Sequence, residues 1–205
     1  MLFRSAEATL PSLIEACKKL ITADRRRALD ERGKKTAAMN QQARERNREL
    51  AALGWDASPI STARLCAEVY AQVKNEDWSL VSFDRMVSSW PTRLWNFSKY
   101  HQYIGAQGGA GIGYGAPAAV GAALANKKHG RLSINIQTDG DLNYQPAVMW
   151  TAAHHQIPML NIMHNNRSYH EERMYVALYG AKFNRGIDRS DIGTALIGPN
   201  IDYAS

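Results

Sequence analysis

Two short apolar runs with a helical segment between them constrain the fold of this chain more than any other feature. The runs are Leu132–Ile136 and Pro158–Met163, and the helical segment extends from Pro146 to His155. Antiparallel strands can be joined by a tight turn, whereas parallel strands need a crossover connection, which is usually a helix. The order strand, helix, strand therefore predicts a βαβ unit. The fold class is α/β, with a parallel sheet that carries helices on both faces.

Three further elements of this sheet domain can be predicted. Trp78–Phe83 has the composition of a short strand, and Ser61 can cap a helix that runs to about Asn75. Six of the fifteen glycines lie within residues 105–115, and a helix of small residues, Ala116–Ala125, follows them. The sheet therefore has at least three strands, and a glycine-rich turn precedes one of its helices.

The first 58 residues predict a helical extension. Glu7–Ile21 carries apolar residues at helical spacing, which indicates an amphipathic helix. Asp24–Leu53 is polar along its whole length, which is typical of a connecting helix with little to bury. A turn at Trp55–Pro59 gives the best boundary. We expect residues 1–22 to be the tail of a preceding domain, 23–58 a helical linker, and 59–205 the sheet domain.

The charge pattern gives no sign of a nucleic-acid partner. Most of the net charge of +6 comes from residues 1–50, which hold twelve Lys or Arg and seven Asp or Glu. These acids and bases interleave, which is typical of a solvated helix. No apolar run reaches the roughly 18 residues of a membrane span, and the first residues lack the features of a signal peptide. Cys17 and Cys66 have no metal-like spacing, and we expect a reducing, cytoplasmic location.

A polar loop follows each strand of the βαβ unit. The loops are Thr138–Asp141 and His164–Ser168, and ligands of open α/β sheets bind outside the carboxyl ends of the strands. Mg²⁺ prefers oxygen ligands, and it usually takes one or two protein groups together with phosphate oxygens and water. The carboxylate of Asp139, the amide of Asn166 and one backbone carbonyl could hold this ion beside a diphosphate. Gly140 would let the backbone turn tightly there.

The two loops resemble the cofactor motif of the thiamine-diphosphate-dependent enzymes, a Gly-Asp-Gly followed by an Asn-Asn pair. Here Asp139 and the second asparagine, Asn166, are 27 residues apart, which is the separation that the family shows. The resemblance implies that these two side chains and the carbonyl of Ser168 bind Mg²⁺. Thr138 stands where the family usually has glycine, so we expect weaker metal binding.

The resemblance also implies contacts with the rest of the cofactor. Gly140 and the backbone N–H of Asp141 would face the diphosphate. The segment Gly109–Ala122 is similar to the family's glycine-rich turn, in which Ile112 would wedge between the two cofactor rings and bend them into a V. The carbonyl of Ala110 would accept a hydrogen bond from the cofactor's amino group. Gly111, between Ala110 and Ile112, would also belong to this part of the cofactor site. The bend brings that amino group beside the reactive carbon, where a proton transfer activates the cofactor. The alternation of glycines does not fit the Gly-x-Gly-x-x-Gly of dinucleotide loops.

The chain resembles most the acetolactate synthase and benzoylformate decarboxylase group, over about residues 59–205. Such enzymes decarboxylate or ligate 2-oxo acids. Their activating glutamate lies in a separate pyrimidine-binding domain, and no segment here resembles that domain. We therefore expect no catalytic residue in this chain, which would be inactive alone and would need a second copy or a partner chain. We also expect that the sequence is truncated, although a natural half-subunit remains an alternative.

Other functions and residues stay open at this stage. The chain could be a non-catalytic cofactor-binding subunit or, more remotely, a Rossmann-type oxidoreductase. His101, His170 and Glu171 flank the two cofactor segments and could face a substrate, or could have structural roles.

Overall fold

The computed structural model of the protein describes residues 5–83, 89–105 and 113–204. By its internal contacts the chain divides into two compact units, Met1–Leu53 and Gly54–Ser205.

The first unit contains two helices, α1 (Ala6–Lys19) and α2 (Ala23–Ala52), which confirms both predicted helices. The hydroxyl of Thr22 caps α2 by accepting a hydrogen bond from the backbone N–H of Arg25 at 3.2 Å. No residue of α1 is buried, so its apolar side chains are exposed. Among the described residues, no helix has both the length and the apolar character needed to cross a membrane. That residues 1–22 are the tail of a preceding domain stays a prediction.

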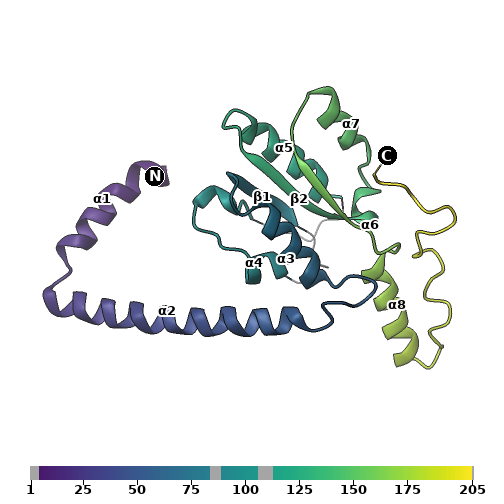
Figure 1. Cartoon of the computed structure of the whole chain (residues 1–205), viewed down its shortest axis with the longest axis horizontal. Helices are drawn as coiled ribbons and strands as arrows, with labels where there is room; N and C mark the ends of the chain where they lie inside the picture. Colours follow the sequence, from purple (N-terminus) through teal and green to yellow (C-terminus); the bar gives the residue numbers. More distant parts are fainter. Residues whose placement is uncertain (1–4, 84–88, 106–112, 205) are drawn as a thin grey trace, which may run out of the picture. The chain divides into compact units, whose positions relative to one another are not determined.

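The second unit is built on a parallel sheet of three strands in the order β1-β2-β3 (Figure 1). The strands are β1 (Trp78–Phe83), β2 (Leu132–Thr138) and β3 (Leu160–His164). This confirms the predicted fold class and all three strands. The sequence analysis ended β2 two residues too early and began β3 two residues too early.

The helices of this unit include three that the sequence predicts, α3 (Thr62–Val73), α5 (Gly115–Lys127) and α7 (Ala147–His154). Ser61 caps α3 as expected, because its hydroxyl accepts from the N–H of Arg64 at 3.2 Å. The remaining helical segments were not predicted: α4 (Trp90–Leu94), the 3₁₀ turn η2 (Tyr100–Gln102), α6 (Asp139–Leu142) and α8 (His170–Lys182). None of the residues in α8 is buried.

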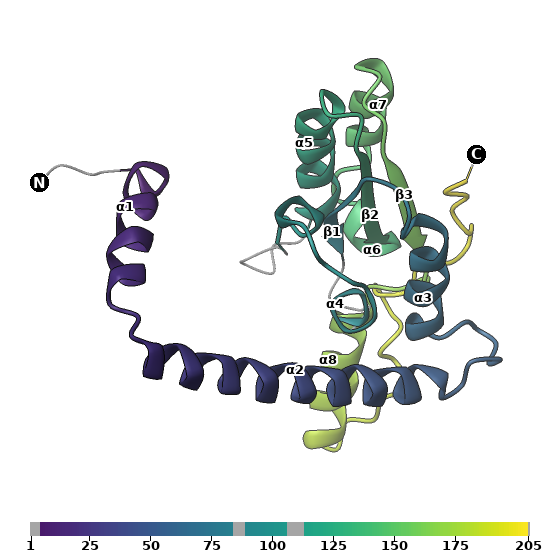
Figure 2. The ribbon, with the colours of Figure 1, turned by 60° about the vertical axis from the view of Figure 1, so that its left-hand side comes forward.

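One face of the sheet is apolar. Trp78, Leu80, Ile134 and Ile136 form a buried cluster with Cys66, Val73 and Trp95 on the side of α3 and α4 (Figure 2). The indole N–H of Trp95 donates to the carbonyl of Cys66 at 2.8 Å, so this aromatic side chain is buried without an unpaired donor. Burial raises the pKa of the Cys66 thiol to about 12, as expected for a cysteine that only packs.

The opposite face of β2 is polar and lies under α5. Ser133, Asn135 and Gln137 alternate with the apolar residues of the strand and are almost completely buried. Asn126 of α5 donates to the hydroxyl of Ser133 at 3.0 Å, and Asn135 donates across the sheet to Asn161 at 2.6 Å. The buried side of α5 consists mainly of glycine and alanine. Small residues therefore let this helix pack close to a strand whose buried polar side chains pair with one another.

The surroundings of Gly115, at the start of α5, show how closely this helix packs against β2. A Cβ atom at this position would lie 2.6 Å from Oε1 of Gln137, whereas one at Gly121 of the same helix would meet nothing within 4 Å. We expect Gly121→Ala to stabilise the fold by about 0.5–1 kcal/mol, because alanine is the better helix former. Gly115→Ala should instead destabilise it by about 1–3 kcal/mol, because the buried Gln137 must move. Denaturant unfolding of both variants measures the difference, and equal stabilities would contradict the close packing.

Candidate cofactor and metal site

The strand register brings the two predicted loops to one edge of the sheet. β2 and β3 are parallel neighbours, and Thr138, the last residue of β2, pairs with His164, the last residue of β3. The loops that follow these residues therefore leave adjacent strands at the same edge. This is the juxtaposition that the sequence analysis expected from a βαβ unit.

Asp139 is completely buried at this edge. Its side chain is 0% exposed, and among the described residues no group donates a hydrogen bond to either carboxylate oxygen. A buried ionised carboxylate without partners is strongly unfavourable, and buried charges in proteins are normally paired or bind a metal. The environment of Asp139 therefore fits a residue that binds a cation.

The side chains of two asparagines form the turns of the second loop. Oδ1 of Asn165 accepts from the N–H of Arg167 at 3.2 Å, and Oδ1 of Asn166 accepts from the N–H of Ser168 at 3.0 Å. These turns place Arg167 at φ 57°, a left-handed conformation that is uncommon for a residue other than glycine. The amide oxygen of Asn166 keeps a second lone pair, so its turn is compatible with binding a metal.

Ser168 connects this loop to a later segment and to Gly140. It forms an antiparallel bridge with Ala195, in which the backbone N–H of Tyr169 donates to Thr194 and the N–H of Leu196 donates to Arg167. The hydroxyl of Ser168 donates to the carbonyl of Thr194 at 3.2 Å. This bridge leaves the carbonyl of Ser168 available. A Cβ atom on Gly140 would lie 3.6 Å from that carbonyl oxygen and only 2.9 Å from the ring of Tyr169. The two loops are therefore in contact, and the position of Gly140 leaves no room for a side chain.

Three tyrosines lie beside the site. The rings of Tyr169 and Tyr144 meet edge to face at 5.8 Å, and the hydroxyl of Tyr203 donates to Asn143 at 3.4 Å. Burial raises the pKa of Tyr203, and the neighbouring Asp139 raises it further. Tyr203 and Thr194 come from the last sixteen residues, where the sequence has no motif that could have indicated a role near the cofactor loops.

Asp141 differs from the sequence prediction, which gave only its backbone N–H a role. Its carboxylate accepts hydrogen bonds from the backbone N–H of Gly113 at 2.5 Å and from the side-chain amide of Gln137. The predicted ring-contacting residues Ala110, Gly111 and Ile112 lie outside the described residues. Gly113, which follows them directly, is held against the Asp139 loop, defined here as Thr138–Asp141.

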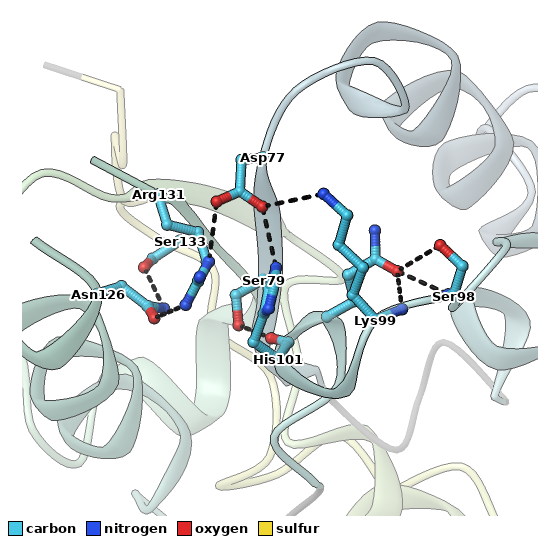
Figure 3. A network of polar contacts seen from close by, with 9 residues as sticks. Asp77, Ser79, Ser98, Lys99, His101, Asn126, Arg131 and Ser133 are labelled. Carbon is cyan, nitrogen blue, oxygen red and sulfur yellow. Dashed lines mark hydrogen bonds and ion pairs between the residues drawn. The ribbon is translucent and has the colours of Figure 1, made fainter. Parts of the chain in front are cut away.

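His101 lies away from this site. Its Nε2 is 2.9 Å from Asp77, which also receives a hydrogen bond from Nε of Arg131 at 3.2 Å (Figure 3). Asp77 and Arg131 immediately precede β1 and β2, so this cluster is at the amino ends of the strands, opposite to Asp139. The structure therefore gives His101 a structural role and does not support a substrate contact. His170 and Glu171 lie in the first turn of α8, directly after Tyr169.

These features define a class of protein. The carboxyl edge of a parallel α/β sheet carries a buried carboxylate with no partner among the described residues, a glycine without room for a side chain and an asparagine turn, and this set is compatible with a phosphate-bearing cofactor and its metal. Residues 86–205, more than half of the chain, match the family described as thiamine pyrophosphate enzyme, C-terminal TPP binding domain. The chain belongs to this family.

Named relatives agree with this assignment. The chain is 36% identical over 78 residues to a benzoylformate decarboxylase of Pseudomonas aeruginosa, a match that covers 38% of this chain and 14% of the relative. It is 33% identical over 106 residues to a Mycobacterium tuberculosis protein named for an acetolactate synthase large subunit, covering 50% of this chain and 19% of the relative. The chain thus spans less than a fifth of the length of either relative.

Two solved structures are similar. A thiamine diphosphate-dependent 4-hydroxybenzoylformate decarboxylase of Rhodococcus jostii RHA1 superposes with a TM-score of 0.56 at 30% identity, over 70% of this chain and 25% of that one. A benzoylformate decarboxylase of Polynucleobacter necessarius gives a TM-score of 0.58 at 18% identity, over 72% and 26%. The second likeness concerns the fold alone.

The Asp77 cluster generates a pH prediction. The hydrogen bond from His101, followed by the contact with Arg131, lowers the pKa of Asp77 below its ordinary value of 3.8. A carboxyl group with a lowered pKa in the folded state stabilises the fold above the unfolded pKa, and this contribution is lost as the pH falls through the folded pKa. Asp77→Asn should therefore be less stable than wild type near neutral pH, and the difference should shrink below about pH 4. Urea unfolding at pH 7, 5 and 3 measures it. A difference independent of pH would contradict this origin.

Proposed function

We propose that this chain binds thiamine diphosphate through Mg²⁺ and forms the cofactor-binding part of an enzyme that decarboxylates or ligates 2-oxo acids. The observation that carries the proposal is the completely buried Asp139, whose carboxylate has no hydrogen-bond donor among the described residues. It lies next to Gly140, at which a Cβ atom would lie 3.6 Å from the carbonyl oxygen of Ser168.

Each residue of the site has a distinct role in this proposal. Asp139, Oδ1 of Asn166 and the carbonyl of Ser168 would hold Mg²⁺, and this set of oxygens is the kind that Mg²⁺ prefers. Gly140 and the N–H of Asp141 would face the diphosphate. Thr138, 7% exposed at the end of β2, would orient the following turn, with weaker metal binding than glycine would give.

The residues for the cofactor's rings are proposed from the family resemblance. Ala110, Gly111 and Ile112 would hold the rings in their bent conformation. When bound, thiamine diphosphate supplies the nucleophilic carbon that attacks the carbonyl of a 2-oxo acid. The family assignment supports the cofactor, and the names of the relatives support the substrate class.

A pyrimidine-binding domain is the partner in this proposal, supplied by a second copy or by another chain. It would contribute the glutamate that activates the cofactor. The surface of α8 supports a covered interface, because Met174, Leu178 and Phe183 are each more than half exposed. A hollow of about 520 Å³ is lined by residues of this helix: Glu171, Met174, Tyr175, Ala177 and Leu178.

The alternative is a subunit that binds the cofactor without taking part in catalysis. It involves the same metal and diphosphate contacts, so binding measurements do not separate it from the enzyme. Measuring turnover in the presence of a pyrimidine-binding domain separates the two alternatives.

The cofactor proposal predicts the behaviour of Asp139→Asn, which keeps the shape of the side chain and removes its charge. Without ligand, this variant should be as stable as wild type or up to about 2 kcal/mol more stable, because an unpaired buried charge is lost. Thiamine diphosphate with Mg²⁺ should stabilise wild type by about 2.7 kcal/mol at 100 times its Kd. The variant should gain little. Thermal unfolding and titration calorimetry measure both effects.

Asp188→Asn is the matched control, since this carboxylate is 80% exposed. It should bind the cofactor as wild type does. Retained binding by Asp139→Asn, or no binding by wild type, would contradict the proposed site.

The partner proposal predicts that CO₂ release from benzoylformate or pyruvate is absent with this chain alone and appears when a separately expressed pyrimidine-binding domain is added. The glutamate of that domain is needed to activate the cofactor by proton transfer. Cofactor binding without turnover by the mixture would favour the non-catalytic alternative. Turnover by this chain alone would show that the activating group lies within it.

A further inference from the structure

A continuous line of hydrogen bonds connects the buried face of the sheet to Gly113, which belongs to the glycine-rich turn predicted from the sequence. Asn135 of β2 donates to Asn161 of β3 at 2.6 Å and also approaches Oε1 of Gln137 at 3.4 Å. The amide of Gln137 then donates to one oxygen of the Asp141 carboxylate, and the other oxygen accepts from the backbone N–H of Gly113 at 2.5 Å. Asp141 is thus the point where the sheet and the turn are joined.

We infer that Asp141 is a positioning residue, which fixes the backbone of Gly113 and the start of α5 relative to the Asp139 loop and so supports binding of the cofactor's rings beside its diphosphate. This inference rests on the proposed function. Asp141 would act through the backbone of Gly113 and need not touch the reacting atoms.

The surroundings of Gly113 favour a fixed rather than an incidental contact. Gly113 has φ +78°, and a Cβ atom there would lie 2.9 Å from Cβ of Tyr144. Only glycine therefore fits without strain in this position, which brings the N–H of residue 113 to the carboxylate. Gly113 directly follows Ile112, so the peptide that Asp141 holds is the next one after the predicted wedge between the cofactor rings.

A second contact fixes the other side of the carboxylate. Gln137 is only 2% exposed, and a Cβ atom on Gly115 would lie 2.6 Å from its Oε1 and 3.0 Å from Oδ2 of Asp141. The carboxylate is therefore confined between β2 and the first residue of α5. Hydrogen bonds to a charged acceptor are about twice as strong as those between neutral groups, so aspartate suits this position.

The arrangement also explains how a negative charge can lie two residues from Asp139, beside an expected diphosphate. Both oxygens of Asp141 face N–H donors, which offset the charge locally. Its backbone N–H remains separate from these contacts. Replacement of the side chain can therefore be tested while the backbone group proposed for the diphosphate is kept.

The test compares two ligands on the full chain, thiamine diphosphate and inorganic pyrophosphate, each with Mg²⁺. Pyrophosphate reports only on the metal and diphosphate contacts, whereas thiamine diphosphate also needs the glycine-rich turn. For Asp141→Ala we expect the Kd of thiamine diphosphate to rise by about tenfold to hundredfold, as for the loss of a charged hydrogen bond. The Kd of pyrophosphate should not rise, because the alanine keeps the backbone N–H and removes a negative charge.

Asp141→Asn is the conservative variant, since its side chain keeps an oxygen that can accept from Gly113. We expect it to restore part of the lost affinity, because a neutral oxygen is a weaker acceptor than a carboxylate and the NH₂ of asparagine cannot accept from Gln137. Asp188→Ala controls for removal of an exposed carboxylate, and unfolding without ligand shows whether each variant is folded.

The outcomes are distinct. If Asp141→Ala weakens both ligands equally, or weakens neither, the positioning role is wrong. Binding of thiamine diphosphate by Asp141→Asn no tighter than by Asp141→Ala would also overturn it, because asparagine still offers an oxygen to the N–H of Gly113. If wild type itself binds neither ligand, the proposed function fails instead.

Discussion

The structure depends on the close packing of α5 against a strand face made of amides and a hydroxyl. Ser133, Asn135 and Gln137 are buried there, and each must be hydrogen-bonded because an unpaired buried polar group is costly. Glycine and alanine on α5 permit the close approach, and Asn126 supplies a partner from the helix itself. The line of amides then extends to Asp141 and Gly113. The same residues that form hydrogen bonds on the buried face of the sheet therefore also place Gly113 and the start of α5.

Asp139 and Asp141 show how position decides the use of a carboxylate. They are two residues apart on one short helix, α6, yet Asp141 accepts from two donors and Asp139 from none among the described residues. A bound cation would complete the surroundings of Asp139, whereas Asp141 already has its partners within the protein. The pair thus separates the proposed tasks of metal binding and of holding the turn, although the sequence alone shows only two similar acids in one loop.

Much of this could be predicted from the sequence, because the signals are local. The apolar runs of β1, β2 and β3, the cap at Ser61 and the parallel order of strands follow from patterns within a few residues. The placement of Asp139 at the strand edge followed from the βαβ unit. Contacts between distant segments could not be predicted in this way. The bridge from Ser168 to Ala195 and the hydrogen bond from Gly113 to Asp141 join residues 27 and 28 positions apart, and no local pattern indicates which residues pair.

The carboxylates at the two edges of the sheet differ in their partners. This difference argues that the lack of partners at Asp139 among the described residues is a feature of the site. At the amino edge, Asp77 is partly exposed and is still surrounded by His101, Arg131 and Lys99. At the carboxyl edge, Asp139 is fully buried and receives no donor from the described residues. Burial makes an unpaired charge more costly. A fold optimised only for stability would therefore have placed the donors beside the buried Asp139 and not beside the partly exposed Asp77. The carboxyl edge is where ligands of open α/β sheets bind, and with no donor among the described residues Asp139 would be available to an ion that arrives with a ligand.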